Sequence, residues 1–520
     1  MKHKLHLSMD YLHTWAGVLF STLLFLVFFM GTLSVFDREI DRWMMPSTRV
    51  TQPSEPSFDK VARPHLERLA PKTSQWYAEY PFDRQPTMRI GWREGTEFKT
   101  RHVDVNTGEL LPDVGTKGGT GFFFPFHYSF HLKWNDVGYW LLAVVSIAML
   151  VLLVSGVIIH KKIFADFFTF RPGKSTHRAT LDLHNASSVL LLPFHFVITF
   201  SGLVIFVFIY MKPGITLLYG EDAPKVQQEA FGQVVRKPAK QPGELASVDA
   251  MVTEAQAIWG SGYVRNVSIR NPLDKHAVVE VLRRPHDTIS YETALVSFDA
   301  ATGKLIGTQN LSTAVKVQRF FSGLHMIPFN HWGLRWMYFV MGLVSCLMIA
   351  TGLLLWVEKR RVRQEREGRT SYRVVSAVTV ASTFGVLVST LSMLVANKLL
   401  PAGLSNRAAI EQYVFFAVWL ASLAHPMARA WGQKRSGDLR VAWREQAWAS
   451  AALALAAVVA NAVYTGDHLL ATLGTGNLAV AATDLVLLVT AALAAWMARR
   501  IAPVAVASIP SRAPVSEVVA

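Results

Sequence analysis

The sequence predicts a mainly α-helical membrane protein with about eight transmembrane helices, and three observations support this fold class. The chain has 520 residues, of which 51% are hydrophobic, and its mean hydropathy is +0.27. Eight apolar runs are each long enough to cross a bilayer, which takes about 20 residues of helix. Two long polar segments interrupt these runs. The runs lie at about 12–36, 139–160, 188–211, 335–357, 374–396, 411–430, 447–465 and 478–498.

The first apolar run is predicted to stay in the protein as a signal anchor. Lys2 and Lys4 make a basic start, but the apolar part is too long for the core of a cleaved signal. No small-residue cleavage site follows it, because the next residues are Asp37, Arg38 and Glu39.

The basic residues predict how the chain is oriented in the membrane. The net charge of +15 is spread over short loops and is not gathered on one groove-sized face, so nucleic acid is not an expected partner. Lysine and arginine are frequent in alternate loops, whereas the loop 397–410 has two such residues and the loop 466–477 has none. The positive-inside rule therefore places both termini in the cytoplasm. The long segments then face the periplasm of a bacterial inner membrane.

The first part of the chain is predicted to contain two repeats of helix, outer domain and helix. Val103–Leu111 matches Ser297–Ile306, since both alternate apolar and polar residues around a Thr-Gly turn. Each outer segment is therefore expected to be a small α+β domain. The predicted units are helix 1–36, outer segment 37–138, helix 139–161, helix 188–211, outer segment 212–334, helix 335–357, four further helices in 374–500, and a cytoplasmic tail at 501–520.

The second outer segment shows its expected elements most clearly. A helix is predicted at 247–259, and strands at Tyr263–Ile269, Ala277–Leu282 and Ser290–Phe298. Residues 221–243 have the composition of a linker. The one cysteine, Cys346, excludes an internal disulfide and any zinc or iron–sulfur site made of several thiolates.

Four histidines placed at or near the ends of membrane helices are the main functional signal. His13 opens the first run, His131 precedes the second, His184 the third and His325 the fourth. An ionisable side chain at membrane depth is costly and indicates function. Neutral imidazole is a standard axial ligand of haem iron, so the pattern predicts two b-type haems and an electron path across the bilayer.

Topology predicts an inner pair, His13 with His184, and an outer pair, His131 with His325. Gly108 precedes His131 by 23 residues and Gly303 precedes His325 by 22, which favours His131 over its neighbour His127.

Two other histidines keep the ligand assignment open. In one straight helix His195 would share a face with His184, about 16 Å along the axis. His195 is then an alternative outer ligand or a residue between the haems. His127 lies four residues before His131, so one of the two is expected to ligate iron and the other to contact a propionate or substrate.

Other residues near the outer interface have two possible roles each. Arg38, Arg42, Arg319 and Arg335 are candidates to bind haem propionates or an anionic ligand, or are ordinary interfacial anchors. The aromatic run that contains Phe122, Phe123 and Phe124 is expected to be an interfacial belt or an apolar lip for a bulky chelate. Glycines within the helices, among them Gly17, Gly31, Gly156, Gly202, Gly342 and Gly352, allow close helix packing or leave room for a flat macrocycle.

An ordered set of motifs resembles the PepSY-associated transmembrane family. The motifs are Leu12–Gly17, Phe126–His131, Ile159–Phe164, Asp166–Gly173, Leu181–Asn185, Leu192–His195 and Gly323–His325, and together they cover about 1–360. The resemblance implies PepSY-like outer domains and an inner-membrane protein linked to iron uptake, since some members are haem-containing ferric-siderophore reductases. The four additional helices depart from the four-helix form of the family.

These observations predict a haem b protein that reduces a ferric siderophore on the periplasmic side and releases Fe2+. No dinucleotide-binding motif is present, so a quinol or a soluble reductase is the expected electron donor. Two alternatives remain: a membrane-anchored PepSY protein that binds a partner or restrains a protease, and a metal or siderophore permease. The permease has little support, because a proton- or ion-coupled carrier usually needs several acidic residues within its spans. Here Asp484 is the acidic residue that lies well inside an apolar run.

Overall fold

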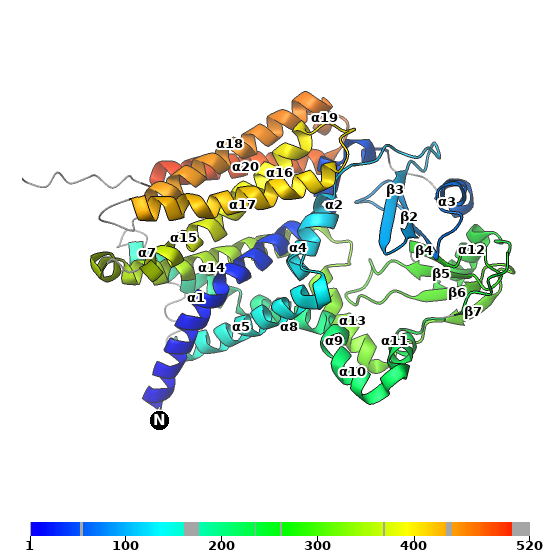
Figure 1. The fold of residues 1–520 in the computed structure, drawn as a ribbon, viewed down its shortest axis with the longest axis horizontal. Coiled ribbons are helices and arrows are strands. Elements are labelled where there is room, and N and C mark those ends of the chain that lie inside the picture. Colours follow the sequence, from blue (N-terminus) through cyan, green and yellow to red (C-terminus); the bar gives the residue numbers. More distant parts are fainter. Residues whose placement is uncertain are drawn as a thin grey trace, which may run out of the picture.

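The computed structural model describes residues 2–51, 56–160, 176–234, 236–260, 263–367, 370–432 and 439–501. Long helices form a bundle, and a β-sheet lies beyond one end of it (Figure 1). The N-terminus lies at the opposite end of the bundle from the sheet. Residues 502–520 of the predicted tail at 501–520, and the parts of the family-like motifs within 161–175, lie outside the described residues.

Within the described residues, seven helical segments are long and apolar enough to span a membrane, or eight if a bent pair counts as one span. The fold class of a mainly helical, multi-pass membrane protein is therefore confirmed. The straight candidates are α1 (Lys2–Ser34), α5 (Val137–Ile159), α14 (Trp332–Glu367), α17 (Arg407–Gly432), α18 (Arg440–Thr465) and α20 (Leu478–Arg500). The remaining one runs through α15 (Thr370–Val380), η6 (Ala381–Gly385) and α16 (Val386–Leu399).

The third span is bent, which corrects one expectation. It consists of α7 (Thr176–Leu190) and α8 (Leu192–Ile205), which meet at an angle of 64°. Pro193 stands at the start of α8, where it has no N–H to donate into the preceding turn. His184 and His195 therefore do not lie on one straight helix, and the predicted shared face is wrong.

The described strands of both outer segments form a single antiparallel sheet. Its order is β3-β2-β1-β4-β5-β6-β7, and the join between the segments is the β1–β4 pair, where Trp76 lies opposite Ile269. The two segments therefore share one sheet, which corrects the prediction of a separate small α+β domain for each segment. The strands are β1 (Gln75–Glu79), β2 (Met88–Glu94), β3 (Glu97–Val103), β4 (Val264–Arg270), β5 (Val278–Arg283), β6 (Leu295–Asp299) and β7 (Leu305–Thr308).

Two helices pack on the sheet and close its core. α3 (Arg63–Leu69) and α12 (Val248–Trp259) bury apolar side chains against Trp76, Val267 and Phe298. The predicted helix at 247–259 and the first two predicted strands of this segment match α12, β4 and β5. The third predicted strand forms only from Leu295, and part of the expected linker is the helix α11 (Ala223–Phe231).

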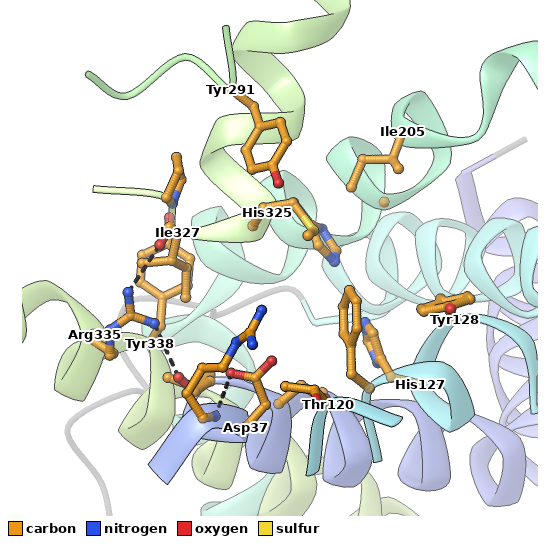
Figure 2. A pocket seen from close by; sticks show the side chains of 18 of the residues that line it. Asp37, Thr120, His127, Tyr128, Ile205, Tyr291, His325, Ile327, Arg335 and Tyr338 are labelled. Atoms are coloured by element: carbon orange, nitrogen blue, oxygen red, sulfur yellow. Dashed lines mark hydrogen bonds between the residues drawn. The ribbon is translucent and has the colours of Figure 1, made fainter. Parts of the chain in front are cut away.

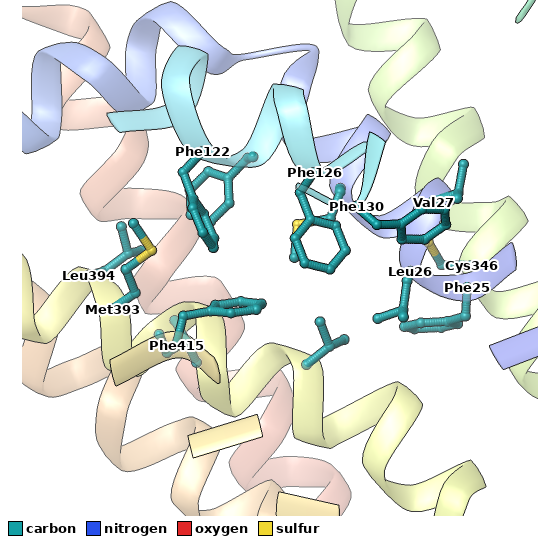
Figure 3. Close-up of a cluster of buried hydrophobic side chains, with 14 of the residues drawn as sticks. Phe25, Leu26, Val27, Phe122, Phe126, Phe130, Cys346, Met393, Leu394 and Phe415 are labelled. Atoms are coloured by element: carbon teal, nitrogen blue, oxygen red, sulfur yellow. The ribbon is translucent and has the colours of Figure 1, made fainter. Parts of the chain in front are cut away.

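Short helices join the sheet to the bundle. They are α2 (Asp37–Met44), η3 (Gly119–Phe123), α4 (Phe124–Ser129), α9 (Val207–Tyr210), α10 (Lys212–Tyr219) and α13 (Thr313–Met326). Phe122 and Phe126 are buried against Phe415 of α17, with ring centroids 5.0 and 5.8 Å from it (Figure 3). The expected interfacial belt or lip is therefore wrong for Phe122 and Phe123, which are core residues. Phe124 instead lines a cavity.

A buried polar cluster fastens the C-terminal helices to α2. The indole N–H of Trp43 donates to Asp484 Oδ1 over 2.7 Å, and Asn461 donates to the other carboxylate oxygen over 3.2 Å. The Lys398 ammonium group lies 4.0 Å from the Trp43 ring centroid and donates to the Trp43 carbonyl. Asp484 and Asn461 are fully buried. Because α2 also lines the cavity, the additional helices support it directly.

We expect Asp484→Ala to destabilise the protein by about 2–6 kcal/mol, because it leaves one buried donor of Trp43 and one of Asn461 unpaired at about 1–3 kcal/mol each. Thr490→Ala in the same helix is the matched control, since the Thr490 hydroxyl is exposed and bonds only its own helix backbone. Thermal unfolding in one detergent measures both variants. Equal unfolding temperatures for the two would contradict this role of the cluster.

Candidate functional site

A cavity of about 910 Å³ lies between the sheet and the membrane helices. Its apolar floor contains residues of α1, α5 and α8 together with His127 and His325. Its roof, on the side of the sheet, contains Arg265, Arg284 and Tyr291. Figure 2 shows His127 and His325 turned toward each other, with Tyr291 beyond them. The size is near the upper end of the range for small-molecule sites, about 300–1,000 Å³.

The rings of His127 and His325 face one another across this floor. Their centroids are 5.9 Å apart and their planes differ by 30°. His127 comes from α4 and His325 from α13, so each outer segment supplies one ring. The outer pair predicted from spacing, His131 with His325, is not what the structure brings together.

Hydrogen bonds fix the tautomer of both rings. Nδ1 of His127 lies 2.8 Å from the Val27 carbonyl oxygen, and Nδ1 of His325 lies 2.9 Å from that of Ile198. A carbonyl oxygen only accepts, so each Nδ1 must carry the proton. The lone pair of each ring is therefore on Nε2, the atom available to a metal.

Glycine gives each ring its space. A Cβ on Gly31 would lie 2.7 Å from Cε1 of His127, and a Cβ on Gly202 would lie 3.1 Å from Cε1 of His325. Any larger residue would push the ring away from the helix that holds it. Close helix packing, the other use considered for these glycines, is thus not their main contact.

The same carbonyl and glycine contacts recur at His13 and His184, and His13 lies near the start of α1, toward the end of the bundle away from the sheet. Nδ1 of His13 lies 3.1 Å from the Leu152 carbonyl oxygen, and Nδ1 of His184 lies 2.9 Å from that of Met348. The two rings are close enough to interact electrostatically. A Cβ on Gly156 or Gly352 would lie 3.3 or 3.1 Å from Cε1 of the respective ring.

All four contacts follow one rule of spacing. The carbonyl that accepts from Nδ1 belongs to a residue four positions before the glycine, which is one helical turn. The four sets are His127 with Val27 and Gly31, His13 with Leu152 and Gly156, His325 with Ile198 and Gly202, and His184 with Met348 and Gly352.

His131 and His195 have the opposite tautomer. Nε2 of His131 lies 3.0 Å from the Phe122 carbonyl oxygen, and that ring stacks on Phe122. Nε2 of His195 lies 2.9 Å from Ser345 Oγ, whose own proton goes to the Met341 carbonyl. In both rings Nε2 is therefore the donor, and neither ring has the carbonyl and glycine contacts of the other four.

The backbone explains why His131 differs from His127. The helix α4 ends at Ser129, and both Phe130 and His131 have positive φ, 51° and 60°. The chain therefore turns away from the helix before His131, which removes this side chain from the inner face. The α13 helix continues to Met326, so His325 remains on a helical face.

A pair of opposed imidazoles fits a metal that already has four equatorial ligands. Two metal–nitrogen bonds of about 2 Å each separate the ring centroids by roughly 6 Å, close to the spacing of His127 and His325. No group of three or more His, Cys, Asp or Glu side chains suited to a bare metal ion occurs in the described part of the chain. Haem iron is a metal of this kind, and His127 and His325 are the residues that would hold it through Nε2.

The roof carries a cluster of arginines around Glu79. Glu79 pairs with Arg38 through Oε1 at 3.2 Å and with Arg89 through Oε2 at 2.7 Å. Arg265 and Arg284 are close enough to add their charges. We call Glu79 and these arginines the Glu79 cluster. Burial alone would raise the pKa of the Glu79 carboxyl, but the four guanidinium groups hold it well below its usual range.

Of the four arginines predicted from the sequence to bind an anion, two line the cavity and two do not. Arg38 and Arg335 line the cavity, where Arg335 donates to the carbonyls of Val35 and Ile327. Arg42 is not among the lining residues, and Arg319 stacks on Phe231, with its guanidinium carbon 5.2 Å from the ring centroid.

Sequence reasoning missed Arg84, Arg89, Arg265 and Arg284, which also line the cavity. Three of them lie in or beside strands, where nothing in the local pattern distinguishes a cavity residue from a solvated one. The four glycines were visible in the sequence, but the helix that each histidine would reach was not.

Comparison with known proteins places this arrangement in a family. Residues 11–359 match the model described as the PepSY-associated TM region, and all four Nδ1-bonded histidines lie inside that match. The uncharacterized protein PA4219 of Pseudomonas aeruginosa is 26% identical over 240 residues, which is 42% of this chain and 59% of the relative. Since the family match extends over more than half of its length, the chain belongs to the PepSY-associated TM region family.

Proposed function

We propose that this protein is a di-haem b electron-transfer protein of a bacterial inner membrane that reduces a ferric siderophore on the periplasmic side. The observation that carries the proposal is the fourfold contact in which Nδ1 bonds a carbonyl and a glycine makes room for the ring. Four matched imidazoles, each with Nε2 left to bind metal, are the number that two bis-histidine haems require.

The two pairs occupy different depths. His13 lies in the N-terminal part of α1, whereas His127 contacts Val27 in its C-terminal part. The N-terminus and the sheet lie at opposite ends of the bundle (Figure 1). We therefore assign His13 and His184 to the cytoplasmic half of the membrane and His127 and His325 to the periplasmic half.

The chain's own residues set the conditions for electron transfer. The Nδ1–H bonds of the four histidines fix the orientation and the tautomer of each imidazole, which leaves Nε2 to ligate a metal. Apolar residues of the floor, such as Val145 and Met149, keep water from the ring pair. Bound haem would supply one-electron exchange between Fe(III) and Fe(II). The expected donor is a quinol or a soluble reductase acting from the cytoplasmic side.

A visible absorption spectrum of the detergent-purified protein, before and after dithionite, tests the proposal. Sharp α and β bands on reduction, with a pyridine haemochrome count of about two b-type haems per chain, would support it. Reoxidation of the reduced protein by a ferric siderophore, with Fe2+ trapped by a colorimetric chelator, would support the substrate. Colourless protein from haem-replete cells would refute the proposed electron transfer through haem.

We expect His127→Ala to lower the haem count from about two to about one, because the haem at this site would lose one of its two iron ligands and the contact that His127 makes with α1. His131→Ala is the matched control, four residues away on the same segment, and should keep both haems. The pyridine haemochrome assay measures both variants. Loss of haem in His131→Ala with retention in His127→Ala would restore the pairing expected from sequence.

We expect Gly31→Ala to displace the His127 ring and to reduce or perturb one haem, since the added Cβ would lie 2.7 Å from Cε1. Gly17→Ala in the same helix is the control, because the nearest atom to its added Cβ is Leu152 Cδ2 at 3.9 Å. The reduced α band and low-spin electron paramagnetic resonance signals report the ligand geometry. Identical spectra for both variants would show that clearance at Gly31 is not needed.

A further inference from the structure

The charges that line the cavity do not balance. Six arginines line it (Arg38, Arg84, Arg89, Arg265, Arg284 and Arg335), against three acidic residues (Asp37, Glu79 and Asp83), a difference of +3. Arg84 is neutralised by ion pairs of 3.1 Å with Asp37 and 2.7 Å with Glu39. The excess of positive charge therefore lies with the Glu79 cluster and Arg335.

Within the Glu79 cluster, a single carboxylate carries the negative charge that faces four guanidinium groups. Arg38 and Arg89 use both oxygens of Glu79. Arg265 and Arg284 have no carboxylate within ion-pair distance in the described part of the chain. Arginines that are half-buried without an acidic partner are costly unless a ligand supplies the missing charge.

Aromatic rings hold these two arginines in place. The Arg284 guanidinium carbon lies 3.9 Å from the centroid of Phe82, and that of Arg265 lies 5.4 Å from the centroid of Tyr291. Arg284 donates one hydrogen bond to the Tyr80 carbonyl over 3.1 Å, while its buried Nε has no hydrogen-bond partner among the described residues. A stacked guanidinium group with N–H groups left to donate is preorganised for carboxylate or another planar oxyanion.

We propose that the Glu79 cluster is the recognition site for the anionic groups of the ferric chelate, so that the protein selects chelates with peripheral carboxylates and net negative charge. The proposal rests on the function proposed above, because it takes the cavity as the place where the chelate is reduced. Chelate carboxylates would bind Arg265 and Arg284, close to the ring pair in the floor of the same cavity.

Haem propionates offer the same chemistry from a different source. With Glu39 counted beside its partner Arg84, six arginines face four acidic residues, a difference of +2 that two propionates would balance. Charge alone therefore does not separate the two sources. Replacing an arginine distinguishes the two sources. If the arginine binds a propionate, the replacement changes haem binding. If it binds the chelate, the replacement changes only the affinity for the chelate.

The test is equilibrium binding of redox-inert gallium(III) complexes to the purified full-length protein by calorimetry. Gallium(III) citrate is the anionic probe, and the gallium(III) complex of desferrioxamine B is the cationic one. Arg265→Gln and Arg284→Gln should each weaken binding of the citrate complex by about tenfold, the loss of one charge-assisted hydrogen bond. Binding of the cationic complex, haem content and haem bands should not change. Arg284→Lys should recover part of the affinity.

Arg283→Gln is the matched control, because Arg283 pairs with Asp287 and does not line the cavity. Equal effects on the two gallium complexes, or wild-type protein that binds neither, would overturn the proposal. Loss or spectral change of haem in the Gln variants would assign the cluster to propionates and also overturn it. Wild-type protein that lacks haem but binds gallium(III) citrate selectively would refute the proposed electron transfer and leave the anion site standing.

Discussion

The hydrogen bond from histidine Nδ1 to a helix carbonyl is the interaction on which the site depends. In an uninterrupted helix that carbonyl accepts from the N–H four residues later, and here the residue in that position is always glycine. The missing side chain lets the imidazole approach the carbonyl from the side, where a second lone pair is available. One local device thus fixes the position, orientation and tautomer of each ring.

This device also constrains the rest of the fold. Each ring is held by a helix other than its own, so ring position depends on packing between helices. The first span α1 offers the Val27 carbonyl to His127 and places its own His13 against α5. In the second half of the family region, the Ile198 carbonyl of α8 accepts from His325, and the Met348 carbonyl of α14 accepts from His184. Any shift of one helix by a fraction of a turn would break a histidine contact.

The sequence predicted the membrane helices well, because each one is a long apolar run whose signal is local. It also indicated that histidines at helix ends matter, since such residues are costly in a membrane. It failed at His131, because the αL conformations of Phe130 and His131 end a short helix, and neither residue is a glycine that would signal such a turn. It failed again at the bend before Pro193, because residues 188–211 form one continuous apolar run with no local sign of a break other than that proline.

The cavity roof could not be predicted for a different reason. Arg38 follows the first span, Arg89 lies in β2, and Arg265 lies in β4. They meet around Glu79 only because β1 pairs with β2 on one side and with β4 on the other. That pairing joins residues almost 200 positions apart, and no local pattern in either segment specifies it.

The C-terminal helices α16 and α20 support the cavity through their contacts with α2. α2 carries Arg38 on the cavity side and Trp43 on the side of Asp484, less than two turns apart. A helix as short as α2 has little stability of its own, since few backbone bonds offset the cost of ordering it. The buried contacts of Trp43 with Asp484 and Lys398 supply what α2 lacks. The C-terminal helices thereby hold the arginine side of the cavity in register with the histidine floor.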